Sequence, residues 1–124
     1  MRLPHVGLDQ AGWVRLDEGT QSSGGAAVLA AAVLDDAEVW ATSWEGDRLS
    51  LRLLVPGVTG TVSRTSIVYH AAAVSGIPLA DVVRRSVLAE RVELDATGAG
   101  RHRIWLGPES ELVISFSDVE LVGG

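Results

Sequence analysis

The sequence predicts an α+β fold, a mostly antiparallel sheet of about six strands with one or two helices packed on it. Three patterns support this prediction. Residues 39–55 alternate like an amphipathic β-hairpin, residues 91–121 alternate again, and residues 25–36 form an alanine-rich apolar run. A chain of 124 residues fits one domain, residues 1–124, with residues 1–11 as a loosely held leading segment.

The turn of the hairpin predicts its register. Gly46-Asp47 suits a two-residue type II′ turn, whose twist matches that of the flanking strands. The opposite pairs on one face are then Trp44 with Leu49, Thr42 with Leu51, and Trp40 with Leu53. Those on the other face are Ser43 with Ser50, Ala41 with Arg52, and Glu45 with Arg48. One face is nearly all apolar, and a one-residue slip would mix the two faces, so this register is strongly favoured.

Two elements are expected ahead of the hairpin. Gly12–Asp17 fits a short strand. A helix is expected from about Gly25 to Asp36, with Ser22 or Ser23 available as its N-cap. Its residues are apolar almost all round, and such a helix is usually buried, so we expect it to lie across a sheet.

The middle of the chain allows two interpretations. Thr61–Val74 fits a long central strand covered on both faces, with Tyr69 on one face and His70 on the other. Leu79–Ala89 fits a short helix that follows a proline. The alanines after His70 also permit a helix and the later valines also suit a strand, so both states stay open for residues 71–89.

The last third of the chain predicts three alternating strands. They are Arg91–Ala96, with Val92 and Leu94 inward and Arg91, Glu93 and Asp95 outward; Arg101–Leu106, with Ile104 and Leu106 inward; and Glu111–Ser117, with Leu112, Ile114 and Phe116 on one face. The stretch Leu112–Phe116 is also a candidate sheet edge that could pair with a second copy, which makes a homodimer a reasonable expectation.

Composition narrows the class of partner. The net charge of −6 and the pI near 4.9 predict a surface that repels phosphate backbones and attracts a basic protein, so nucleic acid is not expected as a partner. The absence of cysteine excludes disulfides and thiolate chemistry. The apolar run at residues 25–34 is too short for a bilayer and follows acidic residues, so we expect no membrane segment. The lack of cysteine favours a cytoplasmic location.

No motif for catalysis, a metal or a cofactor is visible. The histidines His5, His70 and His102 have spacings that match no metal site, and no nucleophile elbow or phosphate-binding loop is present. We therefore expect no catalytic residue, no metal and no cofactor. His70 is interpreted as a hydrogen-bonded core histidine, and the alternative is an acid–base group or ligand contact in a pocket. Strand alternation separates it from Tyr69.

Two groups of residues are candidates for binding a protein. Asp35, Asp36 and Glu38 form an acidic cluster that could dock a basic partner, although solvent exposure is the commoner role of such a cluster. Trp40 and Trp44 share one face of the predicted hairpin. Packing in the core is the default for these two rings, and a protein-binding patch is the alternative.

The basic residues near the C-terminus form a further candidate. Arg101 and Arg103 share a strand face with Trp105, and such a face could bind an anion or a carboxylate-rich partner. A solvated face, with the arginines paired to Glu93 and Asp95 across the hairpin, is the favoured interpretation.

The layout of residues 27–122 resembles the small β-rich immunity proteins of bacterial polymorphic toxin systems. The stretches that carry this resemblance are Leu34–Trp40, Gly46–Leu53 and Glu111–Val122. It implies a non-enzymatic protein-binding domain that inhibits a toxin partner, and the acidic charge agrees with a basic toxin domain. Two rival hypotheses are a purely structural subunit and a sheet-lined cavity that binds or cyclises an apolar small molecule. The wall of that cavity would consist of Trp40, Trp44, Tyr69, His70 and Trp105.

Overall fold

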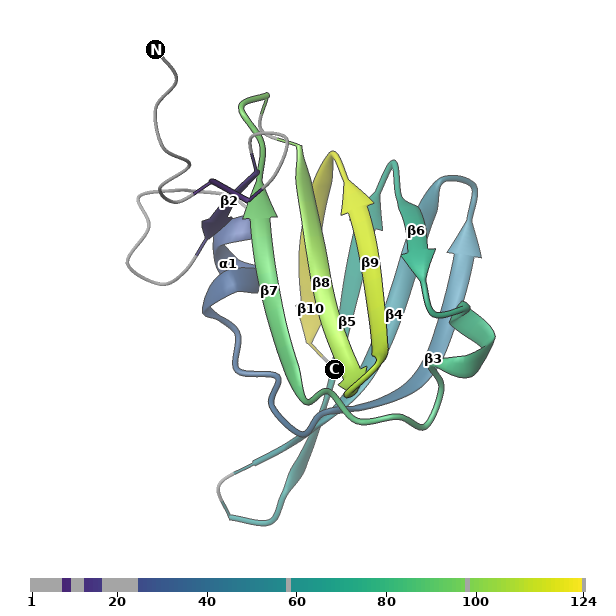
Figure 1. The fold of residues 1–124 in the computed structure, drawn as a ribbon. Coiled ribbons are helices and arrows are strands. Elements are labelled where there is room, and N and C mark those ends of the chain that lie inside the picture. Colours follow the sequence, from purple (N-terminus) through teal and green to yellow (C-terminus); the bar gives the residue numbers. More distant parts are fainter. Residues whose placement is uncertain (1–7, 10–12, 17–24, 58, 98, 124) are drawn as a thin grey trace.

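Two antiparallel sheets face each other in the computed structural model, which describes residues 8–9, 13–16, 25–57, 59–97 and 99–123 (Figure 1). Sheet A contains, in spatial order, β1 (Leu8–Asp9), β2 (Trp13–Leu16), β7 (Ala89–Leu94), β8 (Gly100–Gly107), β9 (Ser110–Phe116) and β6 (Ala73–Gly76). Sheet B contains β10 (Asp118–Gly123), β5 (Val62–His70), β4 (Arg48–Pro56) and β3 (Glu38–Glu45). The helices are α1 (Gly25–Ala31) and the short 3-10 helix η1 (Leu79–Asp81).

The predicted antiparallel α+β class is confirmed in outline, but the expected number of strands is too low and the strands form two sheets. The hairpin and the C-terminal strands each have one apolar face. These faces bury each other, as the inner faces of a β-sandwich do. The short strand expected in residues 12–17 is confirmed as β2, whereas most of the leading segment and the capping serines lie outside the described residues.

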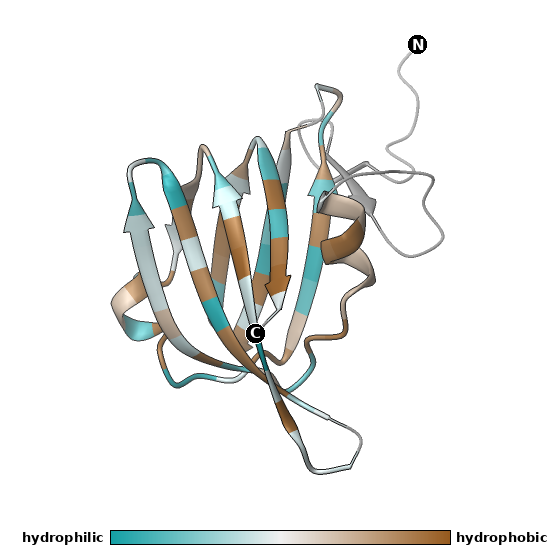
Figure 2. Cartoon of the chain, turned by 180° about the vertical axis from the view of Figure 1, so that it is seen from behind, coloured by the Kyte–Doolittle hydropathy of each residue, from teal (hydrophilic) through white to brown (hydrophobic). Residues whose placement is uncertain are grey.

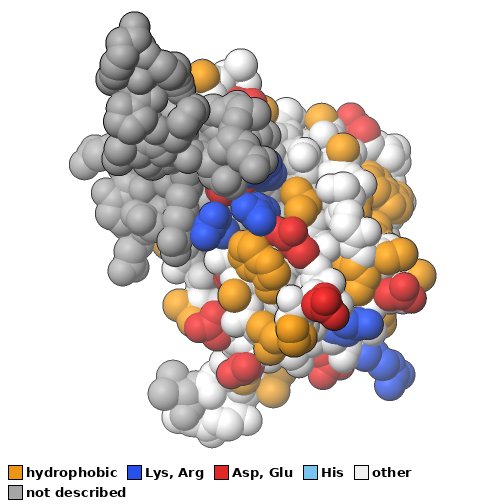
Figure 3. Space-filling model, in the orientation of Figure 1, with side chains coloured by type: hydrophobic (Ala, Val, Ile, Leu, Met, Phe, Trp, Pro, Cys, Tyr) orange, Lys and Arg blue, Asp and Glu red, His pale blue; other side chains and the backbone are white. Residues whose placement is uncertain are grey.

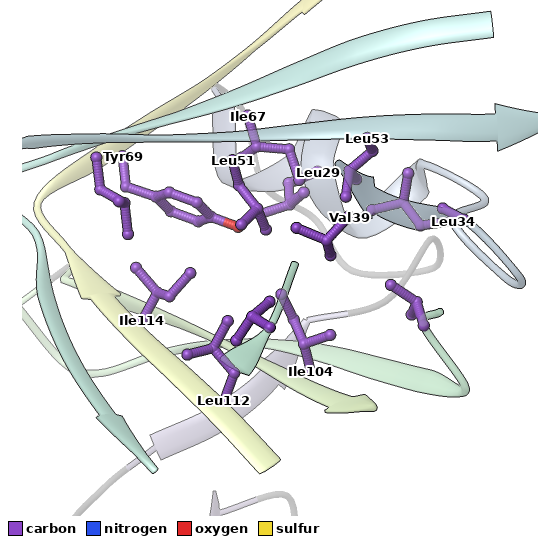
Figure 4. Close-up of a cluster of buried hydrophobic side chains, with 14 of the residues drawn as sticks. Leu29, Leu34, Val39, Leu51, Leu53, Ile67, Tyr69, Ile104, Leu112 and Ile114 are labelled. Carbon is purple, nitrogen blue, oxygen red and sulfur yellow. The ribbon is translucent and has the colours of Figure 1, made fainter. Parts of the chain in front are cut away.

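The core lies between the two sheets (Figure 4). Leu51 and Leu53 of β4 and Tyr69 of β5 point from sheet B toward Ile104 and Ile114 of sheet A, and all five side chains are buried. Burying a side chain of this size stabilises the fold by about 1.5–3 kcal/mol. The predicted inward residues of the last third therefore form sheet A's half of the core.

The predicted turn and most of the hairpin register are confirmed. Gly46 has a φ of 65°, and Asp47 is not among the residues with positive φ, as a type II′ turn requires. The strands pair as predicted from Glu45 opposite Arg48 to Ala41 opposite Arg52.

The helix is shorter than predicted and lies elsewhere. α1 ends at Ala31 and lies against β10 of sheet B and β7 of sheet A, so it covers one open side between the sheets instead of crossing a sheet face (Figure 1). Leu29 is buried, whereas Val28 is 56% exposed. The chain leaves the helix early because Leu34 and Ala37 must reach the core ahead of β3.

The long central strand predicted over residues 61–74 is broken. β5 ends at His70, Ala71 adopts a φ of 54°, and the chain crosses to sheet A, where β6 pairs with β9. The outer face of β5 is only half-buried, so the prediction of cover on both faces is also wrong. β9 lies between β8 and β6, so the stretch expected to be a sheet edge is an interior strand.

The helix predicted at Leu79–Ala89 is absent apart from η1. Instead, this segment runs beside the start of β3, where the amide of Val39 donates to Arg85 O at 2.9 Å and the amide of Arg84 donates to Val39 O at 2.6 Å. Val82 and Val87 are buried. Pairing with another segment and burial of β-branched residues outweigh a weak local preference for helix. Within the described part of the chain, no helix is both long enough and apolar enough to cross a bilayer.

Candidate functional site

A β-bulge in β3 places Trp40 on the outside of sheet B. The register shifts between Val39 and Ala41, so that Val39 lies opposite Leu53, where Trp40 was predicted. Val39 is fully buried and Trp40 is 38% exposed. The extra residue of the bulge thus puts a small valine into the core and turns the indole outward. Core packing of Trp40 was the default prediction, and it is wrong.

Two arginines flank the exposed indole. The guanidinium carbons of Arg52 and Arg64 lie 5.8 and 5.9 Å from the Trp40 ring centroid, within cation–π range. No carboxylate among the described residues forms an ion pair with either arginine. The three side chains line an open depression of about 310 Å³, together with Val122 at its C-terminal side.

Two exposed apolar side chains extend this region. Val62 of β5 is 61% exposed and Val122 of β10 is 48% exposed. Both side chains lie on the outer face of sheet B, as Arg64 does. Figure 2, which views sheet B from outside, shows hydrophobic and hydrophilic residues interleaved along these strands. We call the set of Trp40, Arg52, Val62, Arg64 and Val122 the Trp40 surface.

The acidic cluster borders the Trp40 surface. Asp35 and Asp36 are exposed in the turn before β3, where Asp36 adopts a φ of 64°, and Glu38 is half-buried at the start of the strand. Asp36 and Glu38 rim a second open depression of about 200 Å³, whose other lining residues are Leu54, Pro56 and Val62. An acidic rim over an apolar floor suits the long side chain of an arginine or lysine from a partner.

Trp44 does not share a face with Trp40. It pairs with Leu49 on the inner side of the hairpin, yet it is 48% exposed because β3 is the edge strand of sheet B. The prediction that both rings lie on one apolar face is therefore wrong. The bulge separates them.

Tyr69 and His70 point to opposite faces of β5, as alternation predicts. His70 is not a core residue: it lies on the outer face, a third exposed, with Nε2 3.6 Å from Glu120 Oε1. Tyr69 is buried and its hydroxyl lies 2.7 Å from Nδ1 of His102, whose Nε2 lies 2.6 Å from Glu90 Oε1. His102 is thus the hydrogen-bonded core histidine, with Tyr69 and Glu90 as its partners.

Burial raises the pKa of the Tyr69 phenol well above its usual range, and the negative charge of Glu90 raises it further. The phenol therefore stays protonated. It pairs with Nδ1 of His102, whose Nε2 pairs with Glu90. Tyr69 and His102 are fully buried, and Glu90 is 13% exposed at the end of this chain of hydrogen bonds.

Because Tyr69 is buried in its neutral form, we expect the free energy of unfolding to decrease at alkaline pH. The unfolded chain ionises its tyrosine above about pH 10, whereas the folded chain keeps it protonated, so the stabilisation is complete below about pH 10 and is lost above it, by at most about 1.4 kcal/mol per pH unit. Tyr69 is the single tyrosine, and the chain has no lysine or cysteine, so no other side chain titrates in this range.

The measurement is the free energy of unfolding from about pH 9 to pH 11, in the native chain and in Tyr69→Phe. We expect a decline above pH 10 in the native chain alone. Tyrosinate absorbance that rises near pH 10 while the protein stays folded would contradict the burial argument.

The outer face of sheet A carries an ion-pair network instead of an open anion site (Figure 3). Glu93, predicted to point into solvent, is fully buried and forms ion pairs with Arg101, Arg91 and Arg103. Arg103 also donates to Glu111 at 2.6 Å. The prediction that Arg101 and Arg103 pair with Glu93 across the hairpin is confirmed.

Trp105 completes this network. Its ring centroid lies 5.0 Å from the guanidinium carbon of Arg103 and 5.9 Å from that of Arg91. The ring is half-buried among arginines that already hold carboxylate partners. Trp105 therefore belongs to the packing of sheet A.

The five residues proposed as a cavity wall do not come together. Tyr69 is in the core, Trp40 and His70 are on the outside of sheet B, Trp44 is at its edge, and Trp105 is on the outside of sheet A.

The sequence contained a signal for the buried histidine. Because Ile104 and Leu106 point inward, two-residue periodicity places His102 on the same face. The same argument places Glu90 beside the inward Val92. Arg52 and Arg64 were missed as site residues, because neither the bulge nor the pairing of their two strands was predicted.

None of the protein-family models, curated proteins or solved structures compared with the chain matches it. Among residues 8–9, 13–16, 25–57, 59–97 and 99–123, no group of histidines and carboxylates is arranged to hold a metal ion.

Proposed function

We propose that this chain is a non-enzymatic protein-binding domain, of the kind that inhibits a toxin partner, and that it holds this partner on the Trp40 surface. The observation that carries the proposal is the bulge that exposes Trp40 between two arginines. Tryptophan and arginine are the residues most enriched among binding hot spots, particularly near the centre of an interface.

The surroundings of Trp40 agree with this role. Exposed apolar side chains at Val62 and Val122 add area that a partner can bury. The two arginines already lie against the ring, so less side-chain entropy is lost when they bind a partner's carboxylates or carbonyls.

The acidic cluster supports a partner of opposite charge. Asp35 and Asp36 are exposed, and the depression that Asp36 shares with Glu38 can receive a basic side chain. With a net charge of −6, the chain attracts a basic protein over long range, and this attraction acts mainly on the association rate. The resemblance of layout to immunity proteins favours a basic toxin domain as that partner.

Replacing Trp40 with alanine is expected to weaken partner binding by about 2 kcal/mol or more, roughly thirtyfold, without unfolding the domain. The test captures partners from the native cells with three baits: the native chain, Trp40→Ala and Trp105→Ala. A partner is then identified by mass and its affinity measured. Trp105→Ala is the matched control, because it removes the same side chain from the opposite sheet.

The charge reversal Asp36→Arg tests the contribution of the acidic cluster to binding. It should slow association with a basic partner and reduce the salt dependence of the rate. If the partner binds Trp40→Ala as tightly as the native chain and Trp105→Ala more weakly, the binding surface is on sheet A and the proposal fails.

A further inference from the structure

The outer edge of β3 is open along five residues. The start of the strand is occupied, because Val39 pairs with Arg84 and Arg85 and Glu38 forms a bridge with Ser86. From Ala41 to Glu45, no strand among the described residues pairs with this edge. The other edge strand of sheet B, β10, lies against α1. β3 is therefore the exposed edge of this sheet.

Beyond the β-bulge near its start, the stretch of β3 from Ala41 to Trp44 lacks the other features that usually prevent pairing with another chain. Proteins protect edge strands with lysines, prolines, inward-pointing charges or a covering segment. The residues Ala41, Thr42, Ser43 and Trp44 are uncharged and include no proline. Trp44 is also half-exposed on the inner side of the edge, where a neighbouring strand would cover it.

We propose that β3 pairs with β3 of a second copy of this chain, antiparallel and about a twofold axis at Ser43. A twofold axis perpendicular to the sheet keeps the inner faces of both copies on one side. Each inward-pointing residue of one copy must therefore lie opposite an inward-pointing residue of the other, and each outward-pointing residue opposite an outward-pointing one. Centring on Ser43 pairs the whole open stretch and avoids both the occupied start of β3 and the Gly46 turn. This inference does not depend on the proposed function.

The register makes the two edges complementary. Glu45 lies opposite Ala41 of the second copy, and the next residue across that copy's sheet is its Arg52. Because Ala41 is small, the Glu45 carboxylate can reach across it to the Arg52 guanidinium of the second copy. Within its own chain, this guanidinium has no carboxylate partner among the described residues. The two Trp44 rings are diagonal neighbours across the axis, a spacing of about 7–8 Å that aromatic side chains can bridge.

The test uses the absence of cysteine from the native chain. In Ser43→Cys, the new thiols would face each other across the axis, with Cα atoms about 4.5–5.5 Å apart, within the range of a disulfide. Ser75→Cys is the matched control, because Ser75 is also exposed and lies on β6, an edge strand of sheet A. We expect Ser43→Cys to form a covalent dimer in air and Ser75→Cys to stay uncrosslinked.

Sedimentation of the unmodified chain over a wide concentration range supplies the second readout. We expect a dimer whose dissociation constant rises about tenfold or more in Trp44→Ala, because the ring contact at the axis is lost. A monomer at every concentration overturns the proposal. A dimer in which Ser43→Cys crosslinks no faster than Ser75→Cys overturns it as well, because the contact is then elsewhere.

Discussion

Replacing Glu93 with alanine is expected to lower the free energy of unfolding by about 3 kcal/mol. Glu93 is fully buried and forms ion pairs with the arginines at positions 91, 101 and 103, which are only 34%, 19% and 23% exposed. Without the carboxylate, the three guanidinium groups lose their shared partner, and less negative charge offsets their repulsion on this sheet face. The estimate lies at the low end for a broken buried ion pair, because the arginines keep some contact with water.

Glu111→Ala is the matched control for this prediction. Glu111 accepts a hydrogen bond from Arg103 at 2.6 Å, but its side chain is 33% exposed and Arg103 retains Glu93. Its removal should cost less than about 1 kcal/mol, as for a surface pair. Denaturant unfolding of both variants measures the difference. Equal losses would mean that Glu93 contributes no more than a surface carboxylate.

Gly76→Ala is expected to destabilise the protein by about 3 kcal/mol or more. Gly76 ends β6 with a φ of 90°, and a Cβ atom there would lie 2.1 Å from the carbonyl oxygen of Glu111 in β9. That oxygen accepts a hydrogen bond from Ile77 at 2.9 Å, so it cannot move away without breaking the edge pairing. Backbone strain and a backbone clash therefore add.

Gly46→Ala separates these two causes. Gly46 also has a positive φ, 65°, but nothing lies within 4 Å of the position a Cβ would occupy. It should cost about 1 kcal/mol, the strain alone. Thermal or denaturant unfolding of the two variants gives the comparison, and a Gly46→Ala loss as large as that of Gly76→Ala would refute the role of the clash.

The sequence pattern of the hairpin predicts part of its structure but not the bulge. Its turn and its register up to Ala41 follow from local rules, since one slip would mix apolar and polar faces. The bulge does not follow, because Val39 and Trp40 are both apolar and either could face the core. Volume decides between them: fully buried leucines at Leu51 and Leu53 leave room for a valine, and the larger ring stays outside.

The central segment was mispredicted for a tertiary reason. Ala71 leaves β5 in a left-handed conformation so that the chain can cross from one sheet to the other. Val87 then donates its amide to Ala37 O at 2.8 Å, a contact between residues 50 positions apart. The secondary-structure preferences of the residues between 71 and 89 predict neither the crossing between the sheets nor this hydrogen bond. The prediction that Glu93 is exposed to solvent is wrong for a similar reason. Strand alternation predicts the face of the sheet on which a side chain lies, but not whether other residues cover that face.

In the proposed dimer, Arg52 of the Trp40 surface would bind Glu45 of the second copy, and the toxin partner would contact Trp40 and Arg64. A twofold axis through the β3 edge, perpendicular to the sheet, would place both copies of the Trp40 surface on the same side of one continuous sheet.

If the partner binds the Trp40 surface, it covers the indole that the bulge exposes. Hydroxyl-radical footprinting, with and without the captured partner, tests this directly, because the oxidation of each tryptophan reports the exposure of its own ring. We predict that the partner suppresses the oxidation of Trp40 and leaves that of Trp105 unchanged. A partner that protects Trp105 while Trp40 is oxidised as in the free protein would contradict binding on the Trp40 surface.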